Sequence, residues 1–490
     1  MSSVALGILL GLPLVTALSC GLLKQRNAIE WVNGIGSFLT LCAAVWITFI
    51  VAIEGQILTP KGLFFVDALS NFIILLIAVI GFASSLYSVE YLRAPTTERP
   101  ISDGQIRQYY AILHLFLFTM LLVPVSNNIG FLWIAIESTT LASAFLVGFY
   151  DDEVSVEAAW KYIILCSVGI AFALFGTILT YYSGRSILLG SGDALQWTRL
   201  MVVAEKLDPQ VVKLAFIFIL VGYGTKAGIV PLHSWLPDAH SQAPSPISAL
   251  LSGVLLNSAL YAILRFHLLV TRSIGGEFSG TLLIIFGLLS IVFAAPFMIA
   301  QRNFKRLLAY SSIEHVGIII FGFGLGTPLG LYGASLHMLN NALAKVLLFF
   351  TTGNIIHKYH TKLIPKISGL IKVMPFTGIV FILGIFAITG WPPFGLFISE
   401  FTIASAAFSG TNIFAGILFV LFATLPFIGF IYYGSKMFFG TPRVNIPKER
   451  EHVVSLTIFV VILFTLTLLG IYIPSGLNTI LHNIASAYQQ

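Results

Sequence analysis

The chain has 490 residues, of which 57% are hydrophobic and only 9% are charged, and its mean hydropathy is +0.95. A water-soluble core does not need that much apolar surface, so the composition excludes an ordinary soluble domain and indicates a protein that crosses a membrane many times. The net charge of +6 does not come from one dense basic cluster. Nucleic acid is therefore not expected as a partner.

Apolar windows of about 20 residues are long enough to cross a bilayer as helices. They predict an all-α polytopic membrane protein with about fourteen transmembrane helices. In chain order the windows lie near residues 4–23, 31–53, 68–88, 109–125, 129–149, 158–182, 211–236, 246–271, 279–299, 306–325, 330–356, 374–407, 412–438 and 453–474.

Alternate loops of this arrangement differ strongly in their content of Lys and Arg. The basic side carries Lys24, Arg26, Arg93, Arg99, Arg107, Arg302, Lys305, Arg306, Lys358, Lys362, Lys366, Lys372, Lys436, Arg443, Lys448 and Arg450. The other side carries Lys61, Arg185, Arg199, Lys206, Lys213, Arg265 and Arg272. Because basic loops remain cytoplasmic, we expect a multi-pass protein of the inner (cytoplasmic) membrane with both termini external.

The longest segment outside the windows, residues 183–210, contains DALQWTRLMVVAEKLDP. Its spacing predicts an amphipathic helix that lies on the outer surface or against a neighbour, and a structural connector is the favoured interpretation. The three cysteines, Cys20, Cys42 and Cys166, lie in apolar windows without a CxxC spacing. They are interpreted as small core residues, so no disulfide framework or iron–sulfur site is indicated, and no cofactor or metal is expected.

Two distant segments share an unusual pattern. FILVGYGTKAGIVPLHSWLP at 218–237 and FILGIFAITGWPPFGLFISEF at 381–401 are both apolar helices interrupted by Gly and Pro near the middle, with an ionisable residue close to the break. Their starts are five helices apart, which is an odd offset, so the two copies run in opposite directions through the membrane. Inverted repeats with broken helices place a polar site near the midplane, where Lys226 can be tolerated.

The shared pattern of the two broken helices predicts that the chain is divided into four parts. They are the N-terminal helices in 1–107, a first inverted repeat of helices 4–8 in 108–271, a second of helices 9–13 in 279–440, and a C-terminal helix in 441–490.

Four charged residues lie deep in predicted helices: Glu137, Lys226, Lys345 and Glu400. Each costs about 2.5–3.5 kcal/mol at a helix centre, so four unpaired charges would cost on the order of 10 kcal/mol. Pairing or hydration must offset that cost. Two structural ion pairs are one interpretation, but two acids and two lysines joined by buried histidines fit a proton relay better.

His337, Asn341 and Lys345 recur at i, i+4 and i+8, so they share one helix face that can hold a chain of waters. His315, expected in the first turns of the preceding helix, extends this line. Arg265 and His267 lie near the end of the eighth helix, and we expect them to reach out to the outer interface.

No motif for redox or hydrolytic chemistry is present. GYGTKAG lacks the spacing of a phosphate-binding loop, and no HExxH, catalytic-triad or haem-attachment spacing occurs. We therefore expect a chain that moves charge and holds no redox centre of its own.

At these residues the chain resembles the antiporter-like membrane subunits of respiratory complex I, Mrp-type Na⁺/H⁺ antiporters and membrane-bound [NiFe] hydrogenases, over about residues 65–440. The resemblance implies that Glu137 in WIAIES pairs with Lys226 in GYGTKAGIVPLHSWLPDAH, and that Glu400 leads towards the outlet. The histidine-bearing segments LLAYSSIEHVG and LHMLNNALAK place His315, His337 and Lys345 in the relay. The segments LLNSALYAILRF and YSSIEHVG are most similar to those of the hydrogenase-4 and formate-hydrogenlyase type of subunit.

The chain departs from this family at one central position. Where many relatives carry the lysine of the eighth helix, LSGVLLNSALYAILRF has Asn257. An amide does not take up and release a proton near neutral pH, so hydration must bridge this position or another residue must substitute.

The resemblance implies a proton-translocating subunit of a larger energy-converting oxidoreductase complex, of hydrogenase-4/formate-hydrogenlyase or NADH dehydrogenase type. The implied partners are other membrane subunits, a peripheral redox module, the lipid bilayer, and protons or Na⁺. Two alternatives stay open: a stand-alone or Mrp-type cation/proton antiporter or small-anion transport subunit, and a structural membrane anchor.

Overall fold

The computed structural model of the protein describes residues 2–94, 101–188, 193–410, 412–442 and 451–489. The first half contains α1 (Ser2–Leu22), α2 (Arg26–Glu54), β1 (Ile57–Leu58), β2 (Phe65–Val66), α3 (Ala68–Arg93), α4 (Asp103–Val125), α5 (Ile129–Val147), α6 (Glu153–Leu188), η1 (Asp193–Leu195), α7 (Trp197–Val202), η2 (Ala204–Lys206), α8 (Pro209–Ala227) and α9 (Trp235–Gln242). The second contains α10 (Ser245–Leu250), the π-helical turn η3 (Leu251–Leu255), α11 (Leu256–Ile274), α12 (Glu277–Ile299), α13 (Phe304–Gly324), α14 (Pro328–Tyr359), η4 (Ile364–Lys366), α15 (Leu370–Val373), α16 (Pro375–Ile388), α17 (Gly395–Ser409), α18 (Ile413–Phe438), α19 (Val453–Ile471) and α20 (Ser475–Ala487).

The predicted all-α polytopic class is confirmed. Twelve helices of the described residues are long and apolar enough to cross a membrane, and one two-stranded antiparallel ribbon, β1 with β2, accompanies them. The other two predicted windows correspond to α14, which carries the polar stripe, and to the pair α16 and α17, which the break separates.

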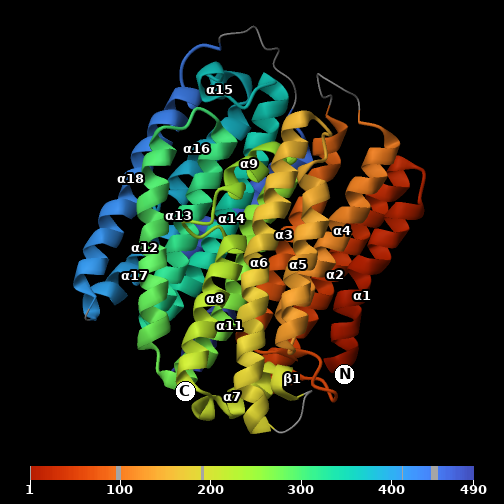
Figure 1. Ribbon diagram of the computed structural model, residues 1–490. Helices are drawn as coiled ribbons and strands as arrows, with labels where there is room; N and C mark the ends of the chain where they lie inside the picture. Colours follow the sequence, from red (N-terminus) through yellow and green to blue (C-terminus); the bar gives the residue numbers. More distant parts are fainter. Residues whose placement is uncertain (1, 95–100, 189–192, 411, 443–450, 490) are drawn as a thin grey trace.

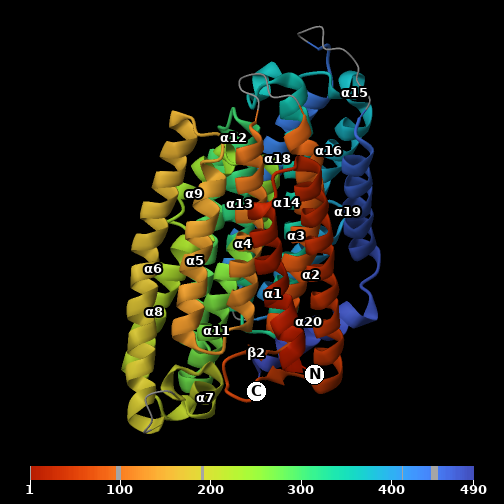
Figure 2. The same ribbon diagram turned by 90° about the vertical axis from the view of Figure 1, so that its right-hand side faces the viewer.

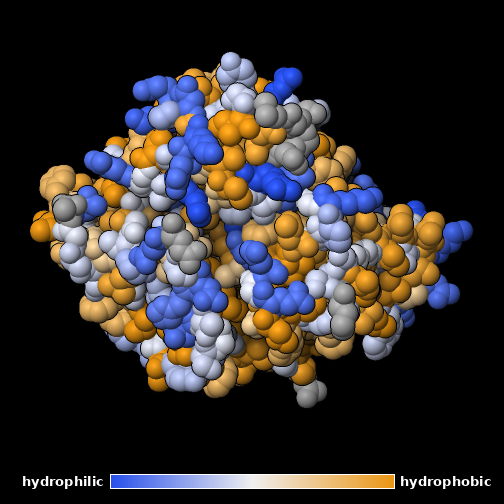
Figure 3. All heavy atoms as spheres, turned by 90° about the horizontal axis from the view of Figure 1, so that it is seen from below, coloured by the Kyte–Doolittle hydropathy of each residue, from blue (hydrophilic) through white to orange (hydrophobic). Residues whose placement is uncertain are grey.

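The helices stand roughly parallel in one bundle, with their ends gathered into two faces (Figure 1). Both termini lie at the lower end in this view, together with α7 and the β-ribbon, while α15 lies at the upper end, and the orthogonal view agrees (Figure 2). From below, hydrophilic residues lie across the middle of the face and hydrophobic residues occupy much of its rim (Figure 3). This distribution suits a bundle whose sides contact lipid while its ends contact water.

The helix starts are stabilised by side chains that accept hydrogen bonds from the unpaired backbone N–H groups of the first turn. These capping residues are Asp67 before α3, Ser102 before α4, Asn128 before α5, Asp208 before α8, Asn303 before α13 and Thr327 before α14.

The first break separates α8 from α9. Gly228 ends α8 with a left-handed backbone (φ 77°), a conformation that glycine adopts without a Cβ clash. The indole Nε1 of Trp235 donates to the carbonyl oxygen of Thr225 at 2.8 Å, and the N–H of Val230 donates to Ser290 Oγ at 3.1 Å. The backbone groups freed by the break therefore find partners inside the protein, as the membrane interior requires.

The second break separates α16 from α17. The N–H of Trp391 donates to the carbonyl oxygen of Phe386 at 3.1 Å, and Gly390 has φ 67°. A Cβ at Gly390 would overlap Glu400 Oε2, so glycine leaves room for the Glu400 carboxylate beside the break. In Figure 1 the pair α8–α9 rises towards the end that holds α15, whereas α16–α17 descends from it. The two broken helices run in opposite directions, and the boundaries of the two repeats stay predictions.

Three expectations about local structure are wrong. Within 193–209 the chain forms three short helical pieces, η1, α7 and η2, instead of one amphipathic helix, and residues 189–192 lie outside the described residues. Cys42 is exposed on α2 instead of lying in the core, whereas Cys20 and Cys166 are buried. A further helix, α20, follows the last predicted span. Its apolar residues face one side, so it lies against the bundle end near α3 and α14 without crossing the membrane.

Candidate functional site

Lys226 ends the first half of the broken helix and is fully buried. Its Nζ donates to Thr140 Oγ1 on α5 at 2.8 Å and to the hydroxyl of Tyr162 on α6. The same ammonium lies 4.5 Å from the centre of the Tyr162 ring, a cation–π distance. The charge is therefore accommodated by two hydroxyl oxygens and an aromatic face.

Glu137 on α5 does not contact Lys226 directly in the described residues. Its carboxylate accepts from Ser167 Oγ on α6 at 2.9 Å and from Thr140 Oγ1 at 3.3 Å. Because Thr140 accepts from Lys226 and donates to Glu137, one hydroxyl joins the two ionisable groups. Thr140 and Tyr162 were not singled out from the sequence, where buried hydroxyl groups carry no distinguishing signal.

The stripe predicted on one helix face is present on α14. His337, Asn341 and Lys345 are all buried. Lys345 Nζ donates to the carbonyl oxygen of Leu308 at 2.9 Å and to Ser311 Oγ, both on α13. The lysine charge is therefore solvated by a helix carbonyl and a hydroxyl group.

His315 lies in the middle of α13, not in its first turns, and its imidazole meets that of His337. Nδ1 of His315 is 3.0 Å from Nε2 of His337, and Nδ1 of His337 is 2.9 Å from Ser399 Oγ on α17. Ligand atoms of His315, His337 and the partly buried Glu400 all lie within 4.8 Å of one another. Three helices thus bring two imidazoles and one carboxylate to one point.

The hydrogen bonds of Ser399 determine the tautomers of this pair. Ser399 Oγ donates its proton to the carbonyl oxygen of Leu396 at 2.9 Å, so it accepts from His337 Nδ1–H. When both imidazoles are neutral, His337 Nε2 is the acceptor and His315 Nδ1–H the donor. The pair is oriented from α13 towards α17.

His240 lies between the two clusters and was missed as a site residue. It is fully buried on α9, its ring centre is 6.3 Å from that of Trp235, and Trp235 stacks near Tyr162 with ring centres 4.7 Å apart. Both ring nitrogens lack a protein hydrogen-bond partner among the described residues. The sequence offered a signal, because PLHSWLPDAH places two histidines beside the break.

Asn257 lies two residues beyond the π-helical turn η3, which interrupts the eighth span. Its Nδ2 donates back to the carbonyl oxygen of Gly253 at 2.8 Å, and the side chain is 2% exposed. The turn η3 packs against α14 near Ala342 and Val346. Single π-helical turns often occur at functional sites, and Asn257 is hydrogen-bonded to the turn that packs against the stripe-bearing helix.

Other buried charges were not anticipated. Glu314, next to His315, and Lys305 at the start of α13 are 3% and 1% exposed. Lys305 Nζ donates to the carbonyl oxygen of Ala243, and Lys362 Nζ donates to that of Ser241 at 2.9 Å. These carbonyls lie at the C-terminal end of α9, where the helix dipole attracts cations. The two lysines therefore hold the upper half of the broken helix.

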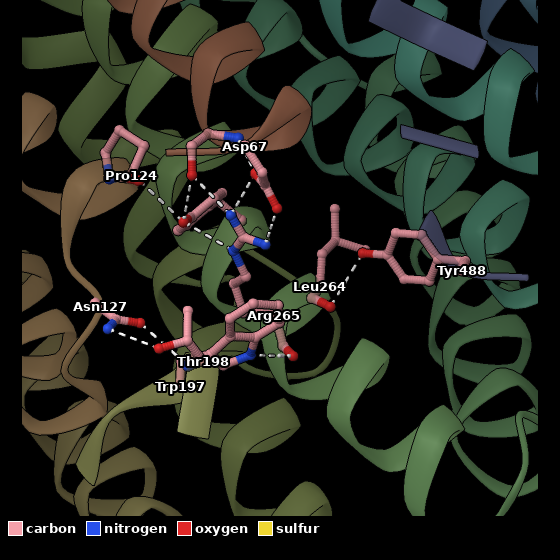
Figure 4. Close-up of polar contacts among 10 residues, drawn as sticks. Asp67, Pro124, Asn127, Trp197, Thr198, Leu264, Arg265 and Tyr488 are labelled. Atoms are coloured by element: carbon pink, nitrogen blue, oxygen red, sulfur yellow. Dashed lines mark hydrogen bonds and ion pairs between the residues drawn. The ribbon is translucent and has the colours of Figure 1, made fainter. Parts of the chain in front are cut away.

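The expectation that Arg265 and His267 reach the outer interface is wrong, because both are buried. The two guanidinium Nη atoms of Arg265 each lie 2.6 Å from an oxygen of Asp67, the residue that caps α3 (Figure 4). Arg265 also donates to Tyr261 and lies 4.5 Å from the ring centre of Trp197. A bidentate ion pair with an aromatic face keeps this charge inside.

This cluster joins segments that are far apart in the chain (Figure 4). Trp197 Nε1 donates to the backbone carbonyl of Arg265 at 3.2 Å, and the Tyr488 hydroxyl donates to that of Leu264 at 3.0 Å. The lower end of the bundle is therefore tied together across α3, α7, α11 and the C-terminal residues.

Comparisons with known proteins identify the family of this chain. The model of the family described as NADH:quinone oxidoreductase/Mrp antiporter, TM, matches residues 126–425. A hydrogenase-4 component F homolog of Methylacidiphilum infernorum is 40% identical over 462 residues, which cover 94% of this chain and 95% of the relative. The NADH-quinone oxidoreductase subunit N of Desulforudis audaxviator is 33% identical over 72% of this chain and 68% of its own.

The fold recurs in a solved respiratory assembly. A chain of the membrane-bound sulfane sulfur reductase, an archaeal respiratory membrane complex, superimposes with a TM-score of 0.88 at 26% identity and covers 99% of this chain and 97% of its own. The family model spans both broken helices and every charged residue of the two clusters. The chain therefore belongs to the antiporter-like membrane subunit family of NADH:quinone oxidoreductases and Mrp antiporters.

Proposed function

We propose that this chain translocates protons as a subunit of a larger energy-converting membrane complex. The observation that carries the proposal is the row of buried and partly buried ionisable side chains that follows the two broken helices. It runs from Glu137 and Lys226 through His240 and Lys345 to the cluster of His315, His337 and Glu400, with Asn257 and Asn341 as supporting polar residues. Intramembrane ionisable residues that face a bundle interior are expensive, and they mark ion or proton routes.

In the first cluster, Thr140 provides a direction for proton movement. Lys226 donates to Thr140, and Thr140 donates to Glu137, so a proton that leaves the ammonium reaches the carboxylate through one hydroxyl group. When Glu137 is ionised its attraction holds the proton on Lys226, and this attraction falls when Glu137 is neutralised or moves away. The glutamate thereby controls whether the lysine holds or releases its proton.

In the second cluster, Lys345 supplies or receives protons on α14, and the His315–His337 pair passes them towards Glu400. Glu400 borders a cavity of about 320 Å³ between α17 and α18, lined in part by Thr389, Thr424 and Trp391. This cavity leaves the carboxylate partly exposed at the side of the bundle.

Two other functions are consistent with the same family. An Mrp-type subunit that exchanges protons for Na⁺, or one that carries a small anion, would use the same buried charges. A structural anchor would not need these charged side chains to gain and lose protons. The hydrogen bond between the imidazoles of His315 and His337 favours proton conduction, because an imidazole can both take up and release a proton.

The partners are proposed from the relatives. The similar proteins are named as components of hydrogenase-4, of NADH-quinone oxidoreductase and of a respiratory membrane complex. We infer that this chain binds other membrane subunits, and through them a peripheral redox module that does the oxidoreductase chemistry.

Neutralising Glu137 tests the function. In Glu137→Gln we expect proton translocation by the assembled complex to fall roughly tenfold or more, because an interaction with a charged group is worth about 1.5–3 kcal/mol. Thr140→Val should give a similar loss, since it removes the bridging hydroxyl. Thr139→Val is the matched control, because the buried Thr139 hydroxyl donates only to its own helix at Ile136. Wild-type translocation in Glu137→Gln and Thr140→Val, at equal assembled protein, would exclude this relay.

Asn257 is expected to organise water along the route. Asn257→Leu should lower translocation several-fold, because a buried water needs two to four polar partners and leucine removes one. Asn257→Lys should retain activity, since relatives with lysine at this position are expected to conduct. Translocation is measured as before. Full activity in Asn257→Leu would show that the route avoids α11.

The proposed sidedness places the basic loops in the cytoplasm and both termini outside. Lys366 is exposed in η4, just before α15, and Lys206 is exposed in η2, just after α7. Because α15 and α7 lie at opposite ends of the bundle (Figure 1), Lys366→Cys and Lys206→Cys are a matched pair for labelling. In a background with the exposed Cys42 changed to Ser, we expect a membrane-impermeant thiol reagent to label Lys206→Cys in intact cells and Lys366→Cys only in inverted vesicles. The reverse pattern would invert the topology.

A further inference from the structure

We propose that His315, His337 and Glu400 form a binding site for a divalent transition metal ion of the Zn²⁺ type, and that an ion bound there blocks proton passage. The binding part stands on the geometry of the three side chains. The blocking part rests on the proposed proton route through the same cluster.

The three ligand atoms converge from three helices. His315 comes from α13, His337 from α14 and Glu400 from α17, and their ligand atoms lie within 4.8 Å of one another. Ligands bound to one tetrahedral zinc ion at about 2.0–2.2 Å are roughly 3.3–3.5 Å apart. The two imidazole nitrogens, at 3.0 Å, need to separate only slightly. The longer and more flexible Glu400 side chain supplies the remaining adjustment.

The donor set selects the class of metal. Two imidazole nitrogens and one carboxylate oxygen suit zinc and neighbouring transition metals, whereas Mg²⁺ and Ca²⁺ prefer sites built from oxygen ligands alone. Three protein ligands leave a fourth position for water, as in open zinc sites. The sequence alone does not predict this metal site, because the three residues are far apart in the chain and form no recognised spacing.

Hydrogen bonds from neighbouring groups orient the two imidazoles for metal binding. Ser399 accepts the Nδ1–H of His337, which keeps the Nε2 lone pair of His337 directed at the cluster. Hydrogen bonding of the second ring nitrogen is how proteins orient metal-binding histidines. For His315, metal binding at Nδ1 requires its proton to move to Nε2 or to leave. An ion at this point therefore replaces the proton that joins the two imidazoles.

The surrounding charges and the cavity are compatible with a bound cation. Glu314, buried on α13, lies within electrostatic reach of Glu400, so two carboxylates can balance the charge, while Lys345 opposes it. Glu400 borders the cavity of about 320 Å³ beside α17 and α18, which gives an ion access from the carboxylate side.

The test measures metal binding in the intact complex without turnover. Purified complex is stripped with a chelator and dialysed against Zn²⁺, and bound zinc is counted by mass spectrometry of the metal. We expect His337→Gln and His315→Gln each to bind one Zn²⁺ fewer per chain than the wild type. Ser399→Ala should retain the site with about 10–100-fold weaker affinity. The matched control is His114→Gln, which removes a buried histidine of α4 that bonds to Asn33 outside the cluster.

Equal zinc binding by the wild type, His315→Gln and His337→Gln would overturn the proposal. Glu400→Gln guards against a folding artefact, because it changes a third helix and should show the same loss. A second measurement separates the two parts: Zn²⁺ should inhibit translocation by the wild type and by His114→Gln. Zinc that binds at the cluster without inhibiting would keep the site, overturn the blocking, and exclude a proton route through these residues.

Discussion

Lys226→Arg is expected to stop proton translocation almost as completely as Lys226→Met, although arginine keeps the positive charge. A proton carrier must release its proton, and arginine holds its proton on the order of 100-fold more tightly than lysine, because their ordinary pKa values differ by about two units or more. The site also favours the compact ammonium, which fits between Thr140 and the Tyr162 hydroxyl.

Translocation is measured in membranes that contain equal amounts of assembled complex. Lys213→Arg is the matched control, because Lys213 lies on the same helix, near its start, and approaches the ring of Phe278 at 5.6 Å. We expect that variant to conduct like the wild type. If Lys226→Arg also conducts normally, Lys226 acts as a fixed charge, and the structural ion-pair interpretation replaces the relay.

Asp67→Asn is expected to give the largest loss of stability. It leaves the buried guanidinium of Arg265, which is 2% exposed, without its bidentate partner. Removing one partner of a buried ion pair costs about 3–5 kcal/mol, because the remaining charge stays desolvated. The measurement is thermal or denaturant unfolding of the purified protein. Asp67→Asn combined with Arg265→Met should recover part of the loss, since no charge is then stranded.

A surface pair provides the control for this prediction. Lys161 is half exposed and pairs with Glu157 on the same helix and with Asp238 on α9 at 3.5 Å. Exposed ion pairs contribute about 0–1 kcal/mol, so Lys161→Met should unfold at nearly the same temperature as the wild type. An Asp67→Asn variant as stable as the wild type would mean that the Tyr261, Ser70 and Trp197 contacts alone suffice to hold Arg265.

The same pair gives stability a pH dependence of known sign. Burial acts to raise the pKa of Asp67, but the charge of Arg265 and the hydrogen bonds from Arg265 and Ser70 prevail, and the pKa is lowered. A carboxyl group with a lowered pKa stabilises the folded state above its unfolded pKa of about 3.9, and this contribution is lost as the pH falls through the folded value. The gap between the wild type and Asp67→Asn should therefore close at strongly acidic pH.

The sequence by itself determined the helices, the two breaks and most of the buried charges. Each of these depends on residues that are close together in the chain. An apolar window of sufficient length must pair its own backbone groups as a helix in lipid, and Gly228 and Gly390 mark where that pairing is interrupted. Likewise, the i, i+4, i+8 spacing was enough to put His337, Asn341 and Lys345 on one face of α14.

Only the tertiary structure decided which of these groups meet. Helical periodicity says which residues share a face, but it does not say which helix that face contacts or at what depth. Thr140 became the bridge to Lys226 because α5, α6 and α8 pack together, and His315 met Glu400 because α13, α14 and α17 do. The sequence predicted that Arg265 lies at the surface near a helix end, because its partner, the partly buried Asp67, is 198 positions away in the chain. Contacts of this range depend on how helices pack against one another, and no local pattern encodes them.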